Sequence, residues 1–330
     1  MKILLGLVLG LGAALTCTAQ KDPLVGVIDI HVHCAPDSTP RSIDAIDLAR
    51  LAKSRGVRGL VLKNHYEPTA SLAYVVRKEV PGIEVFGGVD LNLSVGGMNP
   101  SAVKQMAATT GGYGRVVWMG TFDSEAQVRY SKQVRPFVRV SQNGQLLPET
   151  RQVIALIAKQ NLVLATGHPT AEEALLMIRE GRDQGVKHMV VTHAMMQPIH
   201  MSDAQMREAA KMGAYIEFVY NGLIGSYKEF MFQDYARAIR YVGVDHCILS
   251  SDMGQPPNPL HTDGLVLFFE GLKEQGITQA EIDRMAKENP ARLLGLEYRS
   301  TAREGTVGSK RDDSVLQQSE LPEFPFGDCR

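Results

Sequence analysis

Two histidines separated by a single residue, His31 and His33, follow the apolar run Gly26-Val-Ile-Asp-Ile near the start of the chain. Residues two apart in a β-strand point to the same side, so Asp29 and both imidazoles would face one way. Neutral imidazole nitrogens are good ligands for zinc, iron and similar cations. Taken alone, the pair predicts either a metal site or two core histidines held by hydrogen bonds.

Further polar residues end other short apolar runs. His168 follows Leu162-Val-Leu-Ala-Thr-Gly, His193 follows Met189-Val-Val-Thr, and Asp252 follows Cys247-Ile-Leu-Ser-Ser. Barrel enzymes build their active sites at the C-terminal ends of strands. Five of the nine histidines fall at such ends, namely His31, His33, His65, His168 and His193, which favours the metal site. The other four, His188, His200, His246 and His261, are expected to be structural or exposed.

The elements that position these residues alternate along the chain. Short β-branched and apolar runs predict eight strands, and apolar residues at three- and four-residue spacing predict amphipathic helices between them. The predicted strands are 26–33, 59–63, 83–90, 115–120, 162–168, 188–193, 214–220 and 247–252. The clearest helices are 42–55, 150–160, 171–184, 203–212 and 229–241. Eight such units predict an α/β fold, a (β/α)8 TIM-type barrel, rather than an open sheet.

Two irregularities accompany the eight units. The interval after the fourth strand is long and contains Asn143-Gly144 between two short alternating runs, which predicts a small hairpin insertion there. Asn289-Pro290 opens a last apolar segment, so we expect Asn289 to cap a closing helix.

Both ends of the chain differ from the middle. Residues 1–19 have the basic start, short apolar run and small residues of a secretory signal, with cleavage expected after Ala19. This predicts a periplasmic or secreted protein; a lipoprotein formed through Cys17 fits the sequence less well. Residues 20–298 are the expected barrel, and 299–330, rich in polar residues, the expected flexible tail.

Composition narrows the function classes. Thirty-five basic and 36 acidic residues nearly balance, so no net charge attracts nucleic acid, and no apolar run is long enough for a comfortable membrane span. A small-molecule partner is expected, and a homo-oligomer is compatible with the sequence. Four cysteines without a CxxC pair predict no disulfide framework, and we expect Cys34 and Cys247 to be buried.

The ordered motifs resemble the amidohydrolase superfamily of metal-dependent hydrolases. They are Ile28-Asp-Ile-His31-Val-His33, His168, His193, Asp252 and the closing Asn289-Pro-Ala-Arg-Leu-Leu-Gly-Leu296, and they span nearly the whole mature chain. The resemblance implies that one divalent metal is held by four side chains. Those ligands are His31, His33, His168 and Asp252. His193 would bind a second metal or orient the reacting oxygen, and Asp252 would also shuttle a proton.

One departure from that pattern concerns the fourth strand. Two-metal members place a bridging lysine or glutamate at its end, whereas this strand ends in Trp118-Met-Gly120. One ion rather than two is therefore expected, zinc first and manganese or iron as alternatives. Lys63, at the end of the second strand, has three interpretations: a metal bridge, a cation facing substrate or the reacting oxygen, or an ion-pair partner of Asp29 or Asp90.

The predicted reaction is hydrolysis of an amide, lactam, ester or related C–N or C–O bond by metal-activated water. Asp252, His193 and Lys63 are the expected catalytic residues, because a carboxylate beside the water can take its proton. His65, Tyr66 and Asn221 follow strands two and seven and are expected to contact substrate. A non-hydrolytic decarboxylase or isomerase on the same barrel is the alternative, and a non-enzymatic metal-binding protein the third reading.

Overall fold

The structure is a computed structural model that describes residues 22–297. The predicted signal at 1–19, the predicted tail at 299–330, and the outer cysteines Cys17 and Cys329 lie outside the described residues. Between residues 22 and 297, no helix combines the length and apolar character needed to cross a bilayer.

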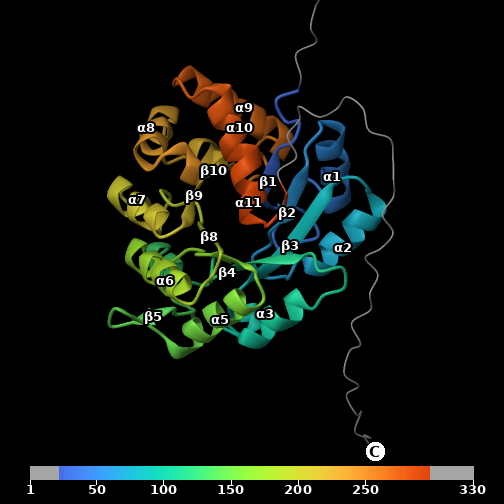
Figure 1. Cartoon of the computed structure of the whole chain (residues 1–330). Coiled ribbons are helices and arrows are strands. Elements are labelled where there is room, and N and C mark those ends of the chain that lie inside the picture. The colour runs from blue at the N-terminus through green and yellow to red at the C-terminus, as the bar shows by residue number, and fades with distance from the viewer. Residues whose placement is uncertain (1–21, 298–330) are drawn as a thin grey trace, which may run out of the picture. The chain divides into compact units, whose positions relative to one another are not determined.

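Eight parallel strands form one sheet, as the alternating pattern predicts (Figure 1). Each strand pairs with the next along the chain, and their residues are almost all buried, as expected for a parallel sheet covered by helices. The strands are β1 (Ile28–Val32), β2 (Gly59–Leu62), β3 (Glu84–Asp90), β4 (Gly114–Trp118), β7 (Val163–Ala165), β8 (His188–Val191), β9 (Ala214–Val219) and β10 (Cys247–Ser250).

The first and last strands meet just beyond β10, which nearly closes the sheet into a barrel. The backbone N–H of Asp252 donates to the carbonyl oxygen of His31 at 2.9 Å, and the N–H of His33 donates to that of Met253 at 2.9 Å. The backbone groups of the predicted ligands His31, His33 and Asp252 therefore make the hydrogen bonds that close the barrel. These bonds hold Asp252 directly beside the His31/His33 pair.

Helices separate the strands and bury an apolar face against them. They are α1 (Ala45–Ser54), α2 (Ala70–Glu79), α3 (Pro100–Ala107), α4 (Glu125–Tyr130), α5 (Pro148–Lys159), α6 (Ala171–Asp183), α7 (Asp203–Lys211), α8 (Phe232–Val242), α9 (His261–Glu274), α10 (Gln279–Asp283) and α11 (Asn289–Leu293). Polar side chains fix several of their starts: Thr170 and Glu173 form a capping box on α6, and Ser202 and Gln205 form one on α7. The (β/α)8 architecture is confirmed.

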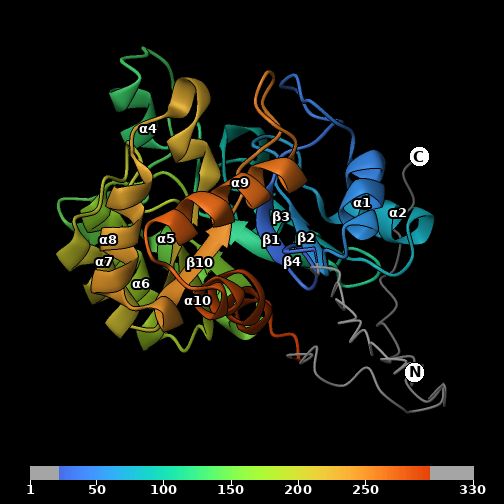
Figure 2. The same ribbon diagram turned by 90° about the horizontal axis from the view of Figure 1, so that it is seen from above.

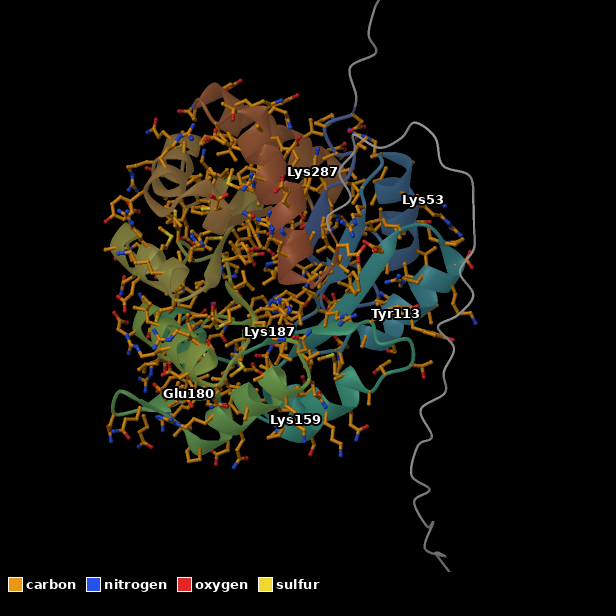
Figure 3. All side chains as sticks on the ribbon, in the orientation of Figure 1. Lys53, Tyr113, Lys159, Glu180, Lys187 and Lys287 are labelled. Carbon is orange, nitrogen blue, oxygen red and sulfur yellow. The ribbon has the colours of Figure 1, made fainter. Side chains whose placement is uncertain are left out.

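The barrel interior is packed with side chains, as Figure 3 shows. Apolar residues of the strands, among them Ile28, Trp118 and Ile248, meet Leu293 and Leu294 of α11 and its C-terminal end. In Figure 1 helix α11 lies across the ring of strands. Tyr113 and Lys187, which are labelled in Figure 3, precede β4 and β8, so the end of the barrel that α11 covers is the N-terminal end of the strands. The opposite end is left for function.

The two predicted irregularities have different outcomes. The hairpin insertion is confirmed as β5 (Ser141–Gln142) and β6 (Gln145–Leu146), with Asn143 and Gly144 at φ values of 51° and 74°. The Asn289 cap is wrong, because the helical backbone runs on from α10 through a π-helical turn at Arg284–Glu288. The buried Asn289 side chain instead donates to the carbonyl oxygens of Val244 and Cys247 at 2.8 and 2.7 Å.

Candidate metal centre

Three of the predicted ligands converge where the first and last strands meet. Single ligand atoms of His31, His33 and Asp252 all lie within 4.8 Å of one another, and each residue is at most 6% exposed. His33 Nε2 is 3.0 Å from Asp252 Oδ1, and His31 Nε2 is 3.2 Å from the same oxygen. Within residues 22–297 this is the one group of three histidine, cysteine or acidic side chains so closely gathered.

Left-handed backbone turns aim two of the polar strand-end residues. Asp252 has a φ of 51° and His193 a φ of 23°, values that cost an ordinary L-residue about 1 kcal/mol or more. Asp252 immediately follows Ser251 beyond β10, and His193 follows Thr192 beyond β8. Such strain persists where the surrounding contacts over-determine it, and it is concentrated at functional sites.

A buried carboxylate orients His31. Both oxygens of Glu217 lie near His31 Nδ1, at 3.2 and 3.3 Å, so Nδ1–H is the donor and Nε2 is turned toward Asp252. Glu217 also accepts from the hydroxyl of Ser250 at 2.6 Å and the backbone N–H of His193 at 2.9 Å. Metal-binding histidines commonly have such a carboxylate on the far nitrogen.

Burial and charge set the protonation of these groups. Burial holds the pKa of His33 and His168 well below 6.5, so both are neutral at pH 7. Burial alone would lower the pKa of His31, but the charges of Asp252 and Glu217 outweigh it and raise that pKa. For Asp252, burial opposes ionisation, yet the neighbouring His31 and His33 bring its pKa well below 3.8. The carboxylate is therefore ionised.

His168 and His193 form a pair next to the His31/His33/Asp252 group. Their Nε2 atoms are 3.1 Å apart, and His168 Nδ1 is 3.0 Å from the amide oxygen of Gln127. The ring of His193 lies 5.9 Å from that of His31, centre to centre. The ring of His65 lies 5.0 Å from that of His33 and 5.9 Å from that of His168, centre to centre, so the five rings form a closed histidine circuit. All five histidines at predicted strand ends thus face one another.

The tautomer of His65 follows from its partners. Asn92 Oδ1 accepts from the backbone N–H groups of Thr121 and Asp123, which leaves its Nδ2 to donate to the Thr121 hydroxyl oxygen at 2.7 Å. The Thr121 hydroxyl donates to Asp90 Oδ2 at 2.9 Å. Because its own proton goes to Asp90, the Thr121 hydroxyl oxygen accepts from His65 Nδ1–H at 3.0 Å, so His65 keeps a lone pair on Nε2.

Lys63 lies fully buried beneath the histidines. Its Nζ is 3.4 Å from Asp90 Oδ2 and 5.6 Å from the centre of the Trp118 ring, and it makes no hydrogen bond within the described residues. The predicted ion pair with Asp90 is therefore present. The charge of Lys63 also contributes to lowering the pKa of His65 and His168.

Asn221 and Tyr66, the two remaining residues predicted to contact substrate, differ in burial and in their neighbours. Asn221 is buried and its Nδ2 donates to Asp252 Oδ2 at 3.2 Å, so it holds the carboxylate. Tyr66 is partly exposed, with its ring 6.5 Å from that of Phe122 at the edge of the histidine circuit. Phe122 precedes α4, which Figure 2 shows on the side of the barrel away from α10.

The donor set fits a divalent cation. Imidazoles and a carboxylate are the ligands that zinc, manganese and iron accept in enzymes. Several enclosed polar atoms also have no partner among the described residues, and an unmade hydrogen bond of this kind costs about 1–3 kcal/mol. Among them at this end of the barrel are Asp29 Oδ2, Lys63 Nζ, Asp90 Oδ1 and His193 Nδ1.

Sequence reasoning missed Glu217, Gln127, Thr121 and Arg41. Only Glu217 left a signal, because it is the single charged residue inside the apolar strand Ala214–Val219. Arg41 lies in the loop after β1, and its Nη2 donates to His33 Nδ1 at 3.2 Å. Nothing in the residues around position 41 indicates that contact.

Known proteins share this fold. No curated protein sequence matches the chain. An organophosphorus hydrolase from Deinococcus radiodurans aligns over 83% of this chain and 94% of its own, with 17% identity and a TM-score of 0.56. An amidohydrolase from Pseudomonas aeruginosa aligns over 83% of this chain and 96% of its own, with 14% identity and a TM-score of 0.56. A 2,6-dihydroxybenzoate decarboxylase from Rhizobium aligns over 82% of this chain and 99% of its own, with 14% identity and a TM-score of 0.52.

At these identities the likeness establishes the fold alone, and it agrees with the (β/α)8 barrel that the alternating strands and helices predict. Among sequence families, one model matches residues 26–217, more than half of the 330 residues. The protein therefore belongs to the family described as "Family of unknown function (DUF6282)".

Proposed function

We propose that the protein is a metal-dependent hydrolase that acts on an amide, lactam, ester or related C–N or C–O bond of a small molecule. The observation that carries the proposal is the convergence of His31, His33 and Asp252 within 4.8 Å, with the Nε2 atoms of both histidines within 3.2 Å of Asp252 Oδ1. Structural zinc sites are closed by four protein ligands, whereas catalytic sites keep a position for a reactant and can expand to five ligands. The gathering of further polar side chains at this end of the barrel favours the second kind of site.

The residues would divide the work as follows. When bound, a divalent cation supplies a Lewis acid that polarises a carbonyl and lowers the pKa of a water molecule. Asp252, ionised and held at Oδ2 by Asn221, takes a proton at Oδ1 and passes it to the leaving group. His193, whose pKa burial lowers to about 4, is a neutral group that orients the reacting oxygen.

Lys63 and the residues after it lie close to the same group of histidines. We assign to Lys63 the stabilisation of negative charge on the reacting oxygen or on the substrate, because its buried ammonium retains unused donors. His65 presents Nε2, and the partly exposed Tyr66 lies beside it at the rim. Both are assigned to substrate contacts.

We further propose one zinc ion, with manganese and iron as the alternatives and His168 as the fourth ligand. The His31/His33/Asp252 group is compact, and β4 ends at Trp118 and is followed by Met119 and Gly120, which offer no lysine or carboxylate to bridge two ions.

A decarboxylase or isomerase is the second candidate. The lack of a bridging ligand on β4 favours it, and a 2,6-dihydroxybenzoate decarboxylase shares the fold. Such a reaction uses the metal to hold a substrate rather than to activate water. Water labelling separates the two readings, because only hydrolysis transfers an oxygen from solvent to product.

The test combines metal analysis with product analysis. Purified protein, with His31→Ala and Asp252→Asn beside it, is assayed for zinc, manganese and iron after growth with each metal. The panel of substrates contains aryl esters, lactones, N-acyl amides and hydroxybenzoates in oxygen-18 water. About one metal per chain in the wild type, lost in His31→Ala, supports the site. Metal-free wild-type protein after every growth condition overturns it, and release of carbon dioxide with no oxygen-18 in the organic product supports the second candidate.

We also propose that the chain is exported. The basis is the signal-like sequence at 1–19. Expression of the full chain in a bacterial host, with mass spectrometry of the periplasmic fraction, should detect a chain that begins at Gln20. A chain retained in the cytoplasm with its first 19 residues intact would contradict export.

A further inference from the structure

The two histidines of the His31/His33 pair use their Nδ1 atoms differently. His31 Nδ1–H donates to Glu217, and His31 Nε2 lies 3.2 Å from Asp252 Oδ1. His33 Nδ1 receives a hydrogen bond from Arg41 Nη2 at 3.2 Å. A guanidinium can only donate, so Nδ1 of His33 must carry the lone pair. The proton of the neutral ring is then on Nε2 and is donated to Asp252 Oδ1 at 3.0 Å.

This arrangement conflicts with metal coordination by His33. A metal ligated through Nε2 requires the lone pair there and therefore a proton on Nδ1. Nδ1–H would point at the N–H of Arg41, so two donors would meet without an acceptor. The positive charge of Arg41 would also oppose a nearby dication.

His33 has little freedom to avoid the conflict. Its backbone N–H donates to Met253, and its carbonyl oxygen accepts from His261 Nε2 at 2.9 Å. Gly254 lies so close that a Cβ there would come within 2.1 Å of that oxygen. The His33 ring is flanked by the rings of His31 and His65 at 5.2 and 5.0 Å. The end of Arg41 is the partner that can move.

We propose that the Arg41–His33 hydrogen bond and metal binding by His33 exclude each other, so that Arg41 weakens metal binding at the His31/His33/Asp252 group. The inference rests on the proposed metal site. Arg41 stays anchored by Asp37, whose Oδ2 accepts from Arg41 Nε at 2.6 Å, while its outer nitrogen leaves His33 as the ion enters. The metal must break a hydrogen bond to a charged group, which lowers its apparent affinity about tenfold or more.

The test is a comparison of metal affinities. The Arg41→Met change alone would leave the Oδ2 atom of the buried Asp37 carboxylate without its cation, so it is combined with Asp37→Asn. Arg41→Lys is a second variant that keeps the charge but cannot span both partners. Chelator-stripped proteins are titrated with zinc and with cobalt against a competing chelating dye. The double variant and Arg41→Lys should each bind zinc about tenfold more tightly than the wild type.

A matched control is the partly exposed ion pair of Arg55 and Asp22, which lies outside the His31/His33/Asp252 group. Its Nε and Oδ2 atoms are 2.5 Å apart. Asp22→Asn combined with Arg55→Met makes the same charge changes and should leave zinc affinity unchanged. Nitrogen-15 spectra of the metal-free wild type should show His33 protonated on Nε2 and His31 on Nδ1.

The outcomes separate the inference from the proposed function. Wild-type protein that binds zinc, with Arg41 variants that bind it no more tightly, overturns the role of Arg41 and leaves the metal site intact. Failure of the wild type and all variants to bind any metal overturns both. A His33 ring protonated on Nδ1 in the metal-free protein also overturns the inference, whatever the affinities.

Discussion

Glu217 holds His31 Nδ1 between its two carboxylate oxygens, at 3.2 and 3.3 Å, across 186 positions of the sequence. Burial would raise the pKa of Glu217, but His31 and the surrounding donors lower it, so the carboxylate is ionised. An anion on the far nitrogen makes the near nitrogen of an imidazole a better metal ligand.

Glu217→Gln should therefore weaken metal binding without emptying the space beside His31. We expect the zinc dissociation constant to rise about 10- to 100-fold, the usual effect of losing such a partner. Competition with a chelating dye measures it. Ser250→Ala removes only the 2.6 Å hydrogen bond to Glu217 and should have a smaller effect. An unchanged constant in Glu217→Gln would show that His31 is not a ligand.

Removal of the metal should destabilise the fold. Ions that bind only the native state stabilise it by about 2.7 kcal/mol at a concentration 100 times the dissociation constant. The ligands also come from both ends of the barrel closure, β1 and the segment after β10. We expect a chelator to lower the melting temperature of the wild type and zinc to restore it. His31→Ala is the control, and its melting temperature should not respond to either addition.

The sequence predicted the eight strands and the residues at their ends for a simple reason. In a parallel barrel, each strand is a short apolar run, and the polar residue that follows it, such as His168 or Asp252, is forced to the mouth. The pattern is local, and so it is visible in one sequence. Strand ends differed from the prediction by only a few residues, because the last polar residues leave the sheet before they reach the site.

Contacts between elements were not predictable in the same way. Glu217, Arg41 and Gln127 reach their histidines from a strand that is not adjacent, a loop and a helix, and their spacing carries no period. The hydrogen bond from Asn221 to Asp252 was likewise not visible in the sequence, which predicts only that Asn221 contacts substrate. Asn289 resembles a helix cap in sequence, and only the packing against β10 shows why it is an amide. Each of these roles depends on a partner distant in sequence.

The Lys63–Asp90 pair should behave as a buried charge pair. Lys63→Met leaves Asp90, whose pKa burial raises, without a cation, and we expect a loss of about 3–5 kcal/mol in the free energy of unfolding. The double variant Lys63→Met/Asp90→Asn should recover most of that loss. Urea unfolding of the metal-free proteins measures both. A double variant as unstable as the single one would mean that the pair is not the reason for the loss.

The buried thiols should be inert in the native protein. Burial raises the pKa of Cys34 to about 12, so the reactive thiolate is absent at pH 8 and would form only above that value. Cys247 is equally enclosed. After treatment with iodoacetamide at pH 8, peptide mass spectrometry should find both unmodified, and both modified once the protein is unfolded in urea. Modification of Cys34 in the folded protein would place it at an opening that the described structure does not contain.

Asn221 offers a test of Asp252 through pH dependence. Its Nδ2 donates to Asp252 Oδ2 at 3.2 Å, a contact that stabilises the ionised carboxylate. Asn221→Asp replaces that donor with a like charge, which raises the pKa of Asp252. A base works only above its pKa, so the acid limb of the activity profile should move to higher pH. Asn221→Ala, which removes the donor without adding charge, should move it less.

The profile is recorded with whichever ester, lactone or amide the wild type hydrolyses, in protein loaded with one equivalent of zinc. Metal content is measured for each variant, because loss of the ion would lower the rate at every pH rather than move the limb. Equal rates and an unmoved limb in Asn221→Asp would remove Asp252 from the proton transfer. A moved limb at unchanged metal content assigns the ionisation to Asp252, because Asn221 touches no other titratable side chain in the described hydrogen bonds.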